Sequence, residues 1–351
     1  MKDKLYFPIL KGKAGEFQAI EDLSAKNKKL IAPILEITDV PWDFQNETYA
    51  KSPDKHLENF GEKIAKSLKG MSFYVDLPES LWEEELDQGF HPIAKIFEVI
   101  RQKELYAIPI TGADRPSEYQ DVVKSIIETD KRGLCLRLPL ERLNLEHING
   151  LLSIFSIKPE EADLLIDVGS IDPTSDTYLG IALQSVITTL PYKSEWRNII
   201  FAATAFPKDL RDVDAGTTSL PRTEWKTWSK LHQSNETKDV KFADYAISHP
   251  EIVVMDPRVI TMSANIRYTT KDDWLIFKGR GVKKHGYSQF TELCQSLIAS
   301  GNYSGEEFSA GDRIIKECST KKLGPGNATV WRKVGVNHHL TFVCNQLSNL
   351  S

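Results

Sequence analysis

The chain has 351 residues, of which 41% are hydrophobic and 26% are charged, and its formal charge is −5 at pH 7. This composition is typical of a globular protein and excludes a collagen-like, low-complexity or disordered chain. No apolar run approaches the ~18 residues that a membrane span requires, and the first residues leave no room for a signal peptide. Four scattered cysteines without a C-x-x-C pair predict reduced thiols and no cysteine zinc site. We therefore expect a cytoplasmic protein that makes no membrane contact.

Short apolar segments recur along the chain up to Pro250, and segments with helical periodicity separate them. One helical stripe, for example, contains Leu57, Phe60 and Ile64. Such alternation over about 250 residues predicts a (β/α)8 TIM-like barrel, with a doubly wound open sheet as the alternative, because one sequence does not reveal strand order. The predicted strands are 6–10, 31–37, 73–77, 107–110, 134–138, 163–168, 198–204 and 242–247.

Each predicted strand carries a polar residue near its carboxyl end. Because successive residues of a strand point to opposite faces, we expect the wholly apolar face to meet the helices and the mixed face to point inward. Barrel enzymes place their functional groups at this end, although solvated charges at loop edges are the alternative interpretation. The polar residues are Lys11, Glu36, Asp76, Thr111, Arg137, Asp167, Thr204 and Asp244.

The alternation of strands and helices stops after Pro250. Residues 265–268 and 274–278 predict a β-hairpin, and helices are expected near 289–298, 314–319 and 329–347. No Pro- or Ser-rich linker precedes these elements. We therefore divide the chain into a barrel at 1–250 and an appendage at 251–351 that packs on it.

The last predicted helix concentrates chemically capable side chains. Arg332 offers a planar fork for phosphate or carboxylate, and His338 and His339 are able to act as acid, base or ligand. Gly335 lies one turn before His339 and would let another surface approach closely. The alternative is a helix that only packs on the barrel, with one histidine bonded to a carbonyl and the other solvated.

Several motifs resemble the beta family proteins, which occur in phages and bacterial genomic islands and which we associate with a phage T4 namesake. These motifs are the opening segments 6–16 (YFPILKGKAGE) and 31–36 (IAPILE), the middle segments 244–250 and 265–268, and the closing segment 311–341. The resemblance covers essentially the full chain and implies a role in anti-phage defence, without a settled activity. It singles out Lys11, Lys13, Glu16, Glu36, Asp244, Arg267, Trp331, Arg332, Asn337, His338 and His339.

The first functional hypothesis is metal-assisted hydrolysis of a phosphoester or nucleotide at the barrel mouth. Four predicted mouth acids outnumber two predicted mouth bases, so a hard ion such as Mg²⁺ or Mn²⁺ would neutralise them and polarise a phosphoryl group. The predicted metal ligands are Glu36, Asp167 and Asp244, and His338 and His339 complete the predicted catalytic set. The predicted substrate-binding residues are Lys11, Lys13, Arg137, Arg267, Trp331, Arg332 and Asn337.

Two alternatives to hydrolysis stay open. Lys11 would form a Schiff base in an aldolase or decarboxylase, which requires a lowered lysine pKa. In the second alternative the chain catalyses nothing: it senses a phage component or binds a protein of a defence complex, and the charged mouth is an internal network of salt bridges.

Lys278, Arg280, Lys283 and Lys284 lie in a basic, glycine-containing run that predicts contact with a nucleic-acid backbone, with solvated loop charge as the alternative. The chain contains no G-x-x-x-x-G-K-[ST] motif and no G-x-G-x-x-G after a strand. We therefore expect neither a P-loop nucleotide site nor an NAD cofactor.

Overall fold

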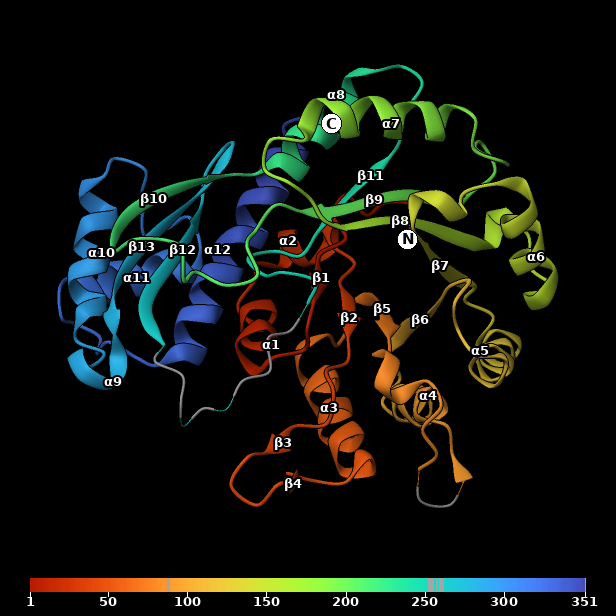
Figure 1. The fold of residues 1–351 in the computed structure, drawn as a ribbon, viewed down its shortest axis with the longest axis horizontal. Helices are drawn as coiled ribbons and strands as arrows, with labels where there is room; N and C mark the ends of the chain where they lie inside the picture. Colours follow the sequence, from red (N-terminus) through yellow and green to blue (C-terminus); the bar gives the residue numbers. More distant parts are fainter. Residues whose placement is uncertain (87–88, 252–255, 257, 259–261, 351) are drawn as a thin grey trace.

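A computed structural model describes residues 1–350 except 87–88, 252–255, 257 and 259–261 (Figure 1). These residues form an eight-stranded sheet, a three-stranded sheet and a two-stranded hairpin. The eight-stranded sheet curls into a barrel with helices outside it, and the three-stranded sheet lies to one side with the last helices of the chain (Figure 1).

The barrel strands follow one another around the ring in chain order, and each pairs in parallel with its neighbour. Tyr6 bridges both Ile31 and Phe242, and the Phe7 amide donates to the Phe242 carbonyl at 3.0 Å, which joins the first strand to the last. The ring confirms the predicted barrel and excludes the open sheet. The strands are β1 Ile9–Leu10, β2 Ile34–Glu36, β5 Ser72–Asp76, β6 Tyr106–Thr111, β7 Leu134–Leu138, β8 Ala162–Ser170, β9 Asn198–Thr204 and β11 Lys241–Asp244.

Side chains alternate between the two faces of the barrel wall as the sequence predicts. Ile34, Tyr74 and Leu165 belong to a buried cluster built from strand residues, which fills the barrel. Their neighbours Leu35 and Val75 join the larger cluster that includes the surrounding helices. Parallel strands buried on both faces have near-continuous apolar sequences, which explains why the strands are visible in this sequence.

The helices around the barrel begin at clear local signals. In α3, the Ser52 hydroxyl accepts from the Lys55 amide and Pro53 occupies the first turn, as helix N-termini favour. The hairpin of β3 (Trp42–Asp43) and β4 (Thr48–Tyr49) lies in the connection before α3. The helices are α1 Ala14–Glu21, α2 Ala25–Leu30, α3 Pro53–Ser67, α4 Pro92–Gln102, α5 Ser117–Asp130, α6 Leu145–Phe155, α7 Asp176–Thr188 and α8 Thr223–Gln233.

The appendage contains the predicted hairpin, β12 (Ser263–Thr269) and β13 (Asp273–Gly281), in antiparallel pairing. A third strand that the sequence analysis missed, β10 (Gly216–Pro221), pairs with the other edge of β13. Because β10 lies between β9 and α8, the appendage sheet contains a strand from the segment assigned to the barrel. The remaining helices are α9 Val282–His285, α10 Gln289–Ala299, α11 Ala310–Ser319 and α12 Ala328–Ser348.

Helix α12 lies between the barrel and the appendage. Val336 and Leu340 join the cluster outside the barrel strands, whereas Trp331 and Val334 join the cluster of the appendage. A helix that packs on two sides is buried nearly all round, so α12 lacks the polar stripe of a surface helix. Within the described ranges, neither α12 nor another helix is long and apolar enough to cross a membrane.

Candidate functional site

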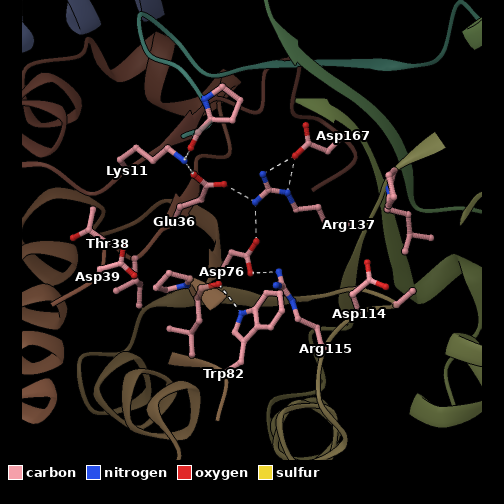
Figure 2. A pocket seen from close by; sticks show the side chains of 18 residues that line it. Lys11, Glu36, Thr38, Asp39, Asp76, Trp82, Asp114, Arg115, Arg137 and Asp167 are labelled. Atoms are coloured by element: carbon pink, nitrogen blue, oxygen red, sulfur yellow. Dashed lines mark hydrogen bonds and ion pairs between the residues drawn. The ribbon is translucent and has the colours of Figure 1, made fainter. Parts of the chain in front are cut away.

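The carboxyl ends of the barrel strands surround a cavity of about 490 Å³, which we call the mouth (Figure 2). Lys11 follows β1, Glu36 ends β2, Asp76 ends β5, and Arg137 and Asp167 lie near the ends of β7 and β8. All five line the cavity because each follows an inward-facing residue by two positions. The sequence therefore correctly predicts that these five side chains meet.

Arg137 lies at the centre of the mouth and bonds to three acids (Figure 2). Its Nη1 is 2.6 Å from Glu36 Oε1 and 2.8 Å from Asp76 Oδ2, and its Nε and Nη2 are 2.8 and 2.6 Å from Asp167 Oδ2. The Tyr245 hydroxyl donates to the same Asp167 oxygen at 2.6 Å and accepts from Arg137 Nη2 at 2.8 Å. One guanidinium thus holds together the ends of four strands.

Two further cations complete the network. Lys11 pairs with Glu36 and also donates to the Pro250 carbonyl. Arg115 Nη2 is 2.7 Å from Asp76 Oδ1, and its guanidinium lies 3.9 Å over the Trp82 ring. The amine that a Schiff base requires is therefore engaged in an ion pair. The three acids of the network face three cations, so the network is formally neutral.

The network also shifts the pKa values of Glu36 and Tyr245. Burial alone would raise the pKa of Glu36, but the charges of Arg137 and Lys11 lower it below its ordinary value. Burial and the neighbouring Asp167 charge raise the pKa of Tyr245 well above its ordinary value, so its hydroxyl stays protonated. The mouth therefore contains a Glu36 carboxylate that two cations keep ionised and a phenol that acts as a hydrogen-bond donor.

Asp244 does not lie at the mouth, which corrects the prediction from the sequence. Its side chain points to the outer face of β11, where Oδ1 accepts from the Tyr6 hydroxyl at 2.5 Å and Oδ2 lies 3.0 Å from His339 Nε2. His339 Nδ1 lies 2.8 Å from the Thr269 hydroxyl. Burial lowers the pKa of His339, so a neutral ring that donates from Nε2 and accepts at Nδ1 satisfies all partners.

The residue after Asp244, Tyr245, occupies the mouth position instead. Thr111 likewise follows the inward-facing Ile110 by one position and so lies on the outer face.

His338 and Asn337 also lie away from the mouth. His338 Nδ1 is 2.8 Å from Asp312 Oδ2, its Nε2 is 2.8 Å from the Thr269 carbonyl, and its ring stacks on Tyr268 at 3.8 Å. The Asn337 amide accepts from Gly311 N and donates to the Ala19 carbonyl, each at 2.9 Å. The Asn337–His338–His339 motif thus connects α12 to the barrel and the appendage, and both histidines are bonded rather than one being solvated.

The predicted metal ligands do not converge. Glu36 and Asp167 meet at Arg137, whereas Asp244 faces the opposite side of the barrel wall. Among the described residues, no group of three or more His, Cys, Asp or Glu side chains is arranged to hold a metal ion. Three cations neutralise the three acids of the network, so the excess negative charge of the mouth lies at the exposed Asp39 and Asp114 and not at the predicted ligands.

The remaining predicted binding residues line a neighbouring cleft. Lys13, Arg267 and Arg332 lie there together, and Lys11 lines both the cleft and the mouth. Trp331 lines a small apolar pocket beside the cleft. Of the predicted nucleic-acid run, Lys278 lines the cleft, whereas Arg280, Lys283 and Lys284 are exposed at the end of β13 and on α9.

Sequence reasoning missed Arg115, Trp82 and Tyr245. Arg115 and Trp82 lie in loops after strands β6 and β5, where periodicity gives no orientation. Tyr245 could have been found, because it shares a strand face with Ala243, which faces the barrel interior.

The fold and the site define a (β/α)8 barrel protein whose mouth contains a closed network of ion pairs. The chain belongs to the beta protein family, because the family described as Beta protein matches residues 6–345. It is also similar to Protein beta of Enterobacteria phage P4, with 24% identity over 357 residues that cover 95% of this chain and 91% of that protein. These matches confirm the family resemblance, but our association with phage T4 was wrong, since this relative comes from phage P4.

Proposed function

We propose that the chain is a non-catalytic binding protein of phage–bacterium conflict, whose barrel mouth receives a basic group of a phage component or of a protein partner in a defence complex. A non-catalytic sensor or partner-binding protein is the alternative to metal-assisted hydrolysis that the sequence left open, although the sequence placed the recognition surface on the appendage, near Trp274 and Trp331, and not at the mouth. The observation that carries it is the saturation of the mouth network around Arg137.

The saturated network disfavours hydrolysis on chemical grounds. A divalent ion at Glu36, Asp76 or Asp167 would have to displace a guanidinium or ammonium that already neutralises the carboxylate. A general base must also be within reach of the substrate, yet His338 and His339 are fully buried elsewhere. A fixed network of this kind is instead suited to hold a receptor site in one shape.

The charge of the rim supports a basic ligand. Among the described residues, five carboxylates and three cations line the mouth, and the two acids outside the network are Asp39 and Asp114. Both are exposed at the rim, where Asp39 accepts from Ser80 and Asp114 lies 3.3 Å from Arg142. Rim acids of this kind attract a lysine, arginine or amine and affect mainly the rate of association. The phage origin of the P4 relative supports the setting of phage–bacterium conflict.

A plating assay tests the proposal. Cells that express the chain are challenged with a panel of phages, and plating efficiency is compared with that of cells expressing an Asp39→Asn/Asp114→Asn variant. We expect the wild-type chain to change the plating of at least one phage and the rim variant to lose that effect. The control variant Glu128→Gln/Glu146→Gln removes two exposed acids from α5 and α6 and should behave like wild type.

A turnover assay tests the competing hypothesis of metal-assisted hydrolysis. The purified chain is incubated with bis(p-nitrophenyl) phosphate and with nucleoside triphosphates in the presence of Mg²⁺ or Mn²⁺. We expect no product above the buffer rate. Metal-dependent turnover that Asp167→Asn abolishes, at an unchanged melting temperature, would restore the hydrolase and overturn the binding proposal.

A further inference from the structure

A second cleft of about 490 Å³ lies beside the mouth, between the start of α1, the loop after β9 and the appendage. Its lining is opposite in charge to that of the mouth: in the part of the chain that the structure describes, seven cations and two acids contribute to it. The acids are Asp209 and Glu251, and the cations are Lys11, Lys13, Lys208, Arg211, Arg267, Lys278 and Arg332.

Some of these cations are already neutralised. Lys11 pairs with Glu36, Lys208 with Glu251, and Arg211 with Asp209. Lys278 donates to the carbonyls of Leu210 and Val213, which hold the ammonium in place without neutralising it.

Lys13, Arg267 and Arg332, which we call the cationic triad, lack comparable partners. In the described part of the chain, Glu16 is the carboxylate nearest to the triad: its Oε1 is 3.7 Å from Arg332 Nη1, and its Oε2 accepts from the Lys13 backbone amide. Neither the Lys13 ammonium nor the Arg267 guanidinium has a carboxylate within 4.0 Å among those residues. The undescribed residues between 252 and 261 include no Asp or Glu, so that segment cannot supply a missing acid.

The triad is held together by the packing of the helices. An added Cβ at Gly15 would lie 2.6 Å from the Thr329 carbonyl and 3.0 Å from Arg332 Cβ, so the glycine lets α1 and α12 approach closely. Arg267 is fixed by a 2.7 Å bond to the Ile247 carbonyl, and its guanidinium lies 4.9 Å from the Phe206 ring centre. The Arg267 guanidinium and the helices that carry Lys13 and Arg332 are therefore in place before any ligand binds.

This proximity has an electrostatic cost. Burial, followed by the charge of Arg332, lowers the pKa of Lys13 to about 8 and that of Arg267 to about 9. Like charges that are partly removed from water repel one another, and a bound anion relieves that repulsion. The fork of an arginine fits two oxygens of a phosphate group.

A small apolar pocket of about 80 Å³ opens beside the triad and shares Arg267 and Arg332 with the cleft. Three aromatic rings line it in a stack: Tyr287 and Phe290 are 6.1 Å apart at 14°, and Phe290 and Trp331 are 4.3 Å apart at 4°. Flat aromatic surfaces next to fixed cations are the combination with which proteins bind a base and its phosphate.

We propose that the cationic triad binds the phosphate group of a nucleotide, and that the edge of its base enters the pocket beside Tyr287 and Trp331. The nucleotide is either free or the end of a single-stranded nucleic acid, since both present the same phosphate and base. This site is separate from the mouth and does not depend on the function proposed above.

Isothermal titration tests the phosphate contact with inorganic phosphate, adenosine and adenosine monophosphate as probes. We expect wild type to bind the monophosphate and to ignore adenosine, and Arg332→Gln to weaken monophosphate binding about tenfold. Lys208→Gln removes a cation of the same cleft that Glu251 already neutralises, so its affinity should stay within about twofold of wild type. Failure of wild type to bind any phosphate at millimolar concentration, or equal affinity of Arg332→Gln, would overturn the site.

Tyr287→Ala tests the base contact, because Tyr287 is half-buried at the pocket. It should weaken binding of the monophosphate and leave that of inorganic phosphate unchanged; equal effects on both would overturn the placement of the base. Fluorescence polarisation with a six-nucleotide strand, with or without a 5′-phosphate, distinguishes the two sources. Tighter binding of the phosphorylated strand than of the monophosphate supports a nucleic-acid end, and the reverse order supports a free nucleotide.

Discussion

Asp244 and Tyr245 are consecutive residues whose side chains form hydrogen bonds on opposite faces of the barrel wall. The Asp244 carboxylate lies 3.0 Å from His339 on the outside, and the Tyr245 hydroxyl lies 2.6 Å from Asp167 in the mouth. The end of β11 thereby connects α12 to the mouth through two adjacent side chains. The same short segment thus contributes both to the packing of α12 and to the hydrogen bonding of Asp167.

Loss of the central mouth cation should destabilise the protein in a pH-dependent way. Arg137→Met leaves Glu36, Asp76 and Asp167 without their shared partner, and breaking a buried ion pair from one side costs about 3–5 kcal/mol. The pKa of Glu36, which Arg137 lowers in the wild type, would rise in the variant, so Glu36 would be protonated more readily and the variant should lose less stability at pH 5 than at pH 7. Urea unfolding at both pH values measures the loss of stability. The control is Arg142→Met, which breaks the pair with the exposed Asp114. An equal loss at both pH values would contradict the prediction.

His339→Ala should destabilise the protein by about 3 kcal/mol, because it removes a fully buried donor from Asp244 and leaves a cavity. His285→Ala, on the exposed α9, should change stability by less than about 0.5 kcal/mol. Thermal unfolding of the two variants provides the comparison. If His339→Ala has the melting temperature of wild type, the hydrogen bonds around Asp244 do not stabilise the junction between β11 and β1.

The buried Glu224 should make the protein less stable as the pH rises, because its pKa is raised. Burial raises the pKa of its carboxyl to about 8, although Arg222 opposes that shift. Between pH 4.5 and 8 the folded state therefore holds a proton that the unfolded state releases, and the free energy of unfolding falls by up to about 1.4 kcal/mol per pH unit from this group. Glu224→Gln should remove that slope.

Urea unfolding of wild type and Glu224→Gln at pH 5, 6, 7 and 8 measures the effect. The stability of the variant relative to wild type should increase with each step in pH. Glu146→Gln, on the surface of α6, provides the baseline. Parallel curves for wild type and Glu224→Gln would show that Glu224 is already ionised in the folded protein.

Gly335→Ala should be destabilising by about 1–3 kcal/mol. An added Cβ would lie 2.6 Å from Ile247 Cδ1 and 3.1 Å from the Arg267 carbonyl, so the buried Ile247 side chain would have to repack and the Arg267 backbone would have to shift by a few tenths of an ångström. Gly150 in α6 is the matched control, because an added Cβ there meets no atom within 4 Å. Gly150→Ala should stabilise the helix by up to about 1 kcal/mol. Thermal unfolding that ranks the two substitutions in the opposite order would contradict the close contact.

The barrel could be predicted because each strand is marked by its own apolar residues, which are buried on both faces, and pairs with the next barrel strand along the chain. The pairing of β10 with β13 could not be predicted, since β10 contains exposed and half-exposed polar residues and its partner begins more than fifty residues later. The short run 216–221 lacks the apolar character that marks the barrel strands. Edge strands of this kind are defined by a partner rather than by their own composition.

The candidate site could be predicted in part for the same reason. Side-chain parity correctly places Glu36, Arg137 and Asp167 at the mouth, because the alternation of faces is local. It fails at Asp244, since a buried carboxylate on the helix side is tolerable only with His339, which lies 95 residues further along the chain. Without that partner, the sequence favours exposing the acid at the mouth.

Helix α12 covers the junction between the first and last barrel strands and follows both of them in the chain. Strands β1 and β11 meet through Tyr6 and Phe242, and the contacts that cover this junction come from His339 and its neighbours on α12. A nascent chain that has emerged only as far as β11 exposes this junction to solvent and to other chains. Ribosome-bound intermediates should therefore have an uncovered junction between β1 and β11 and be prone to recruit chaperones until α12 emerges.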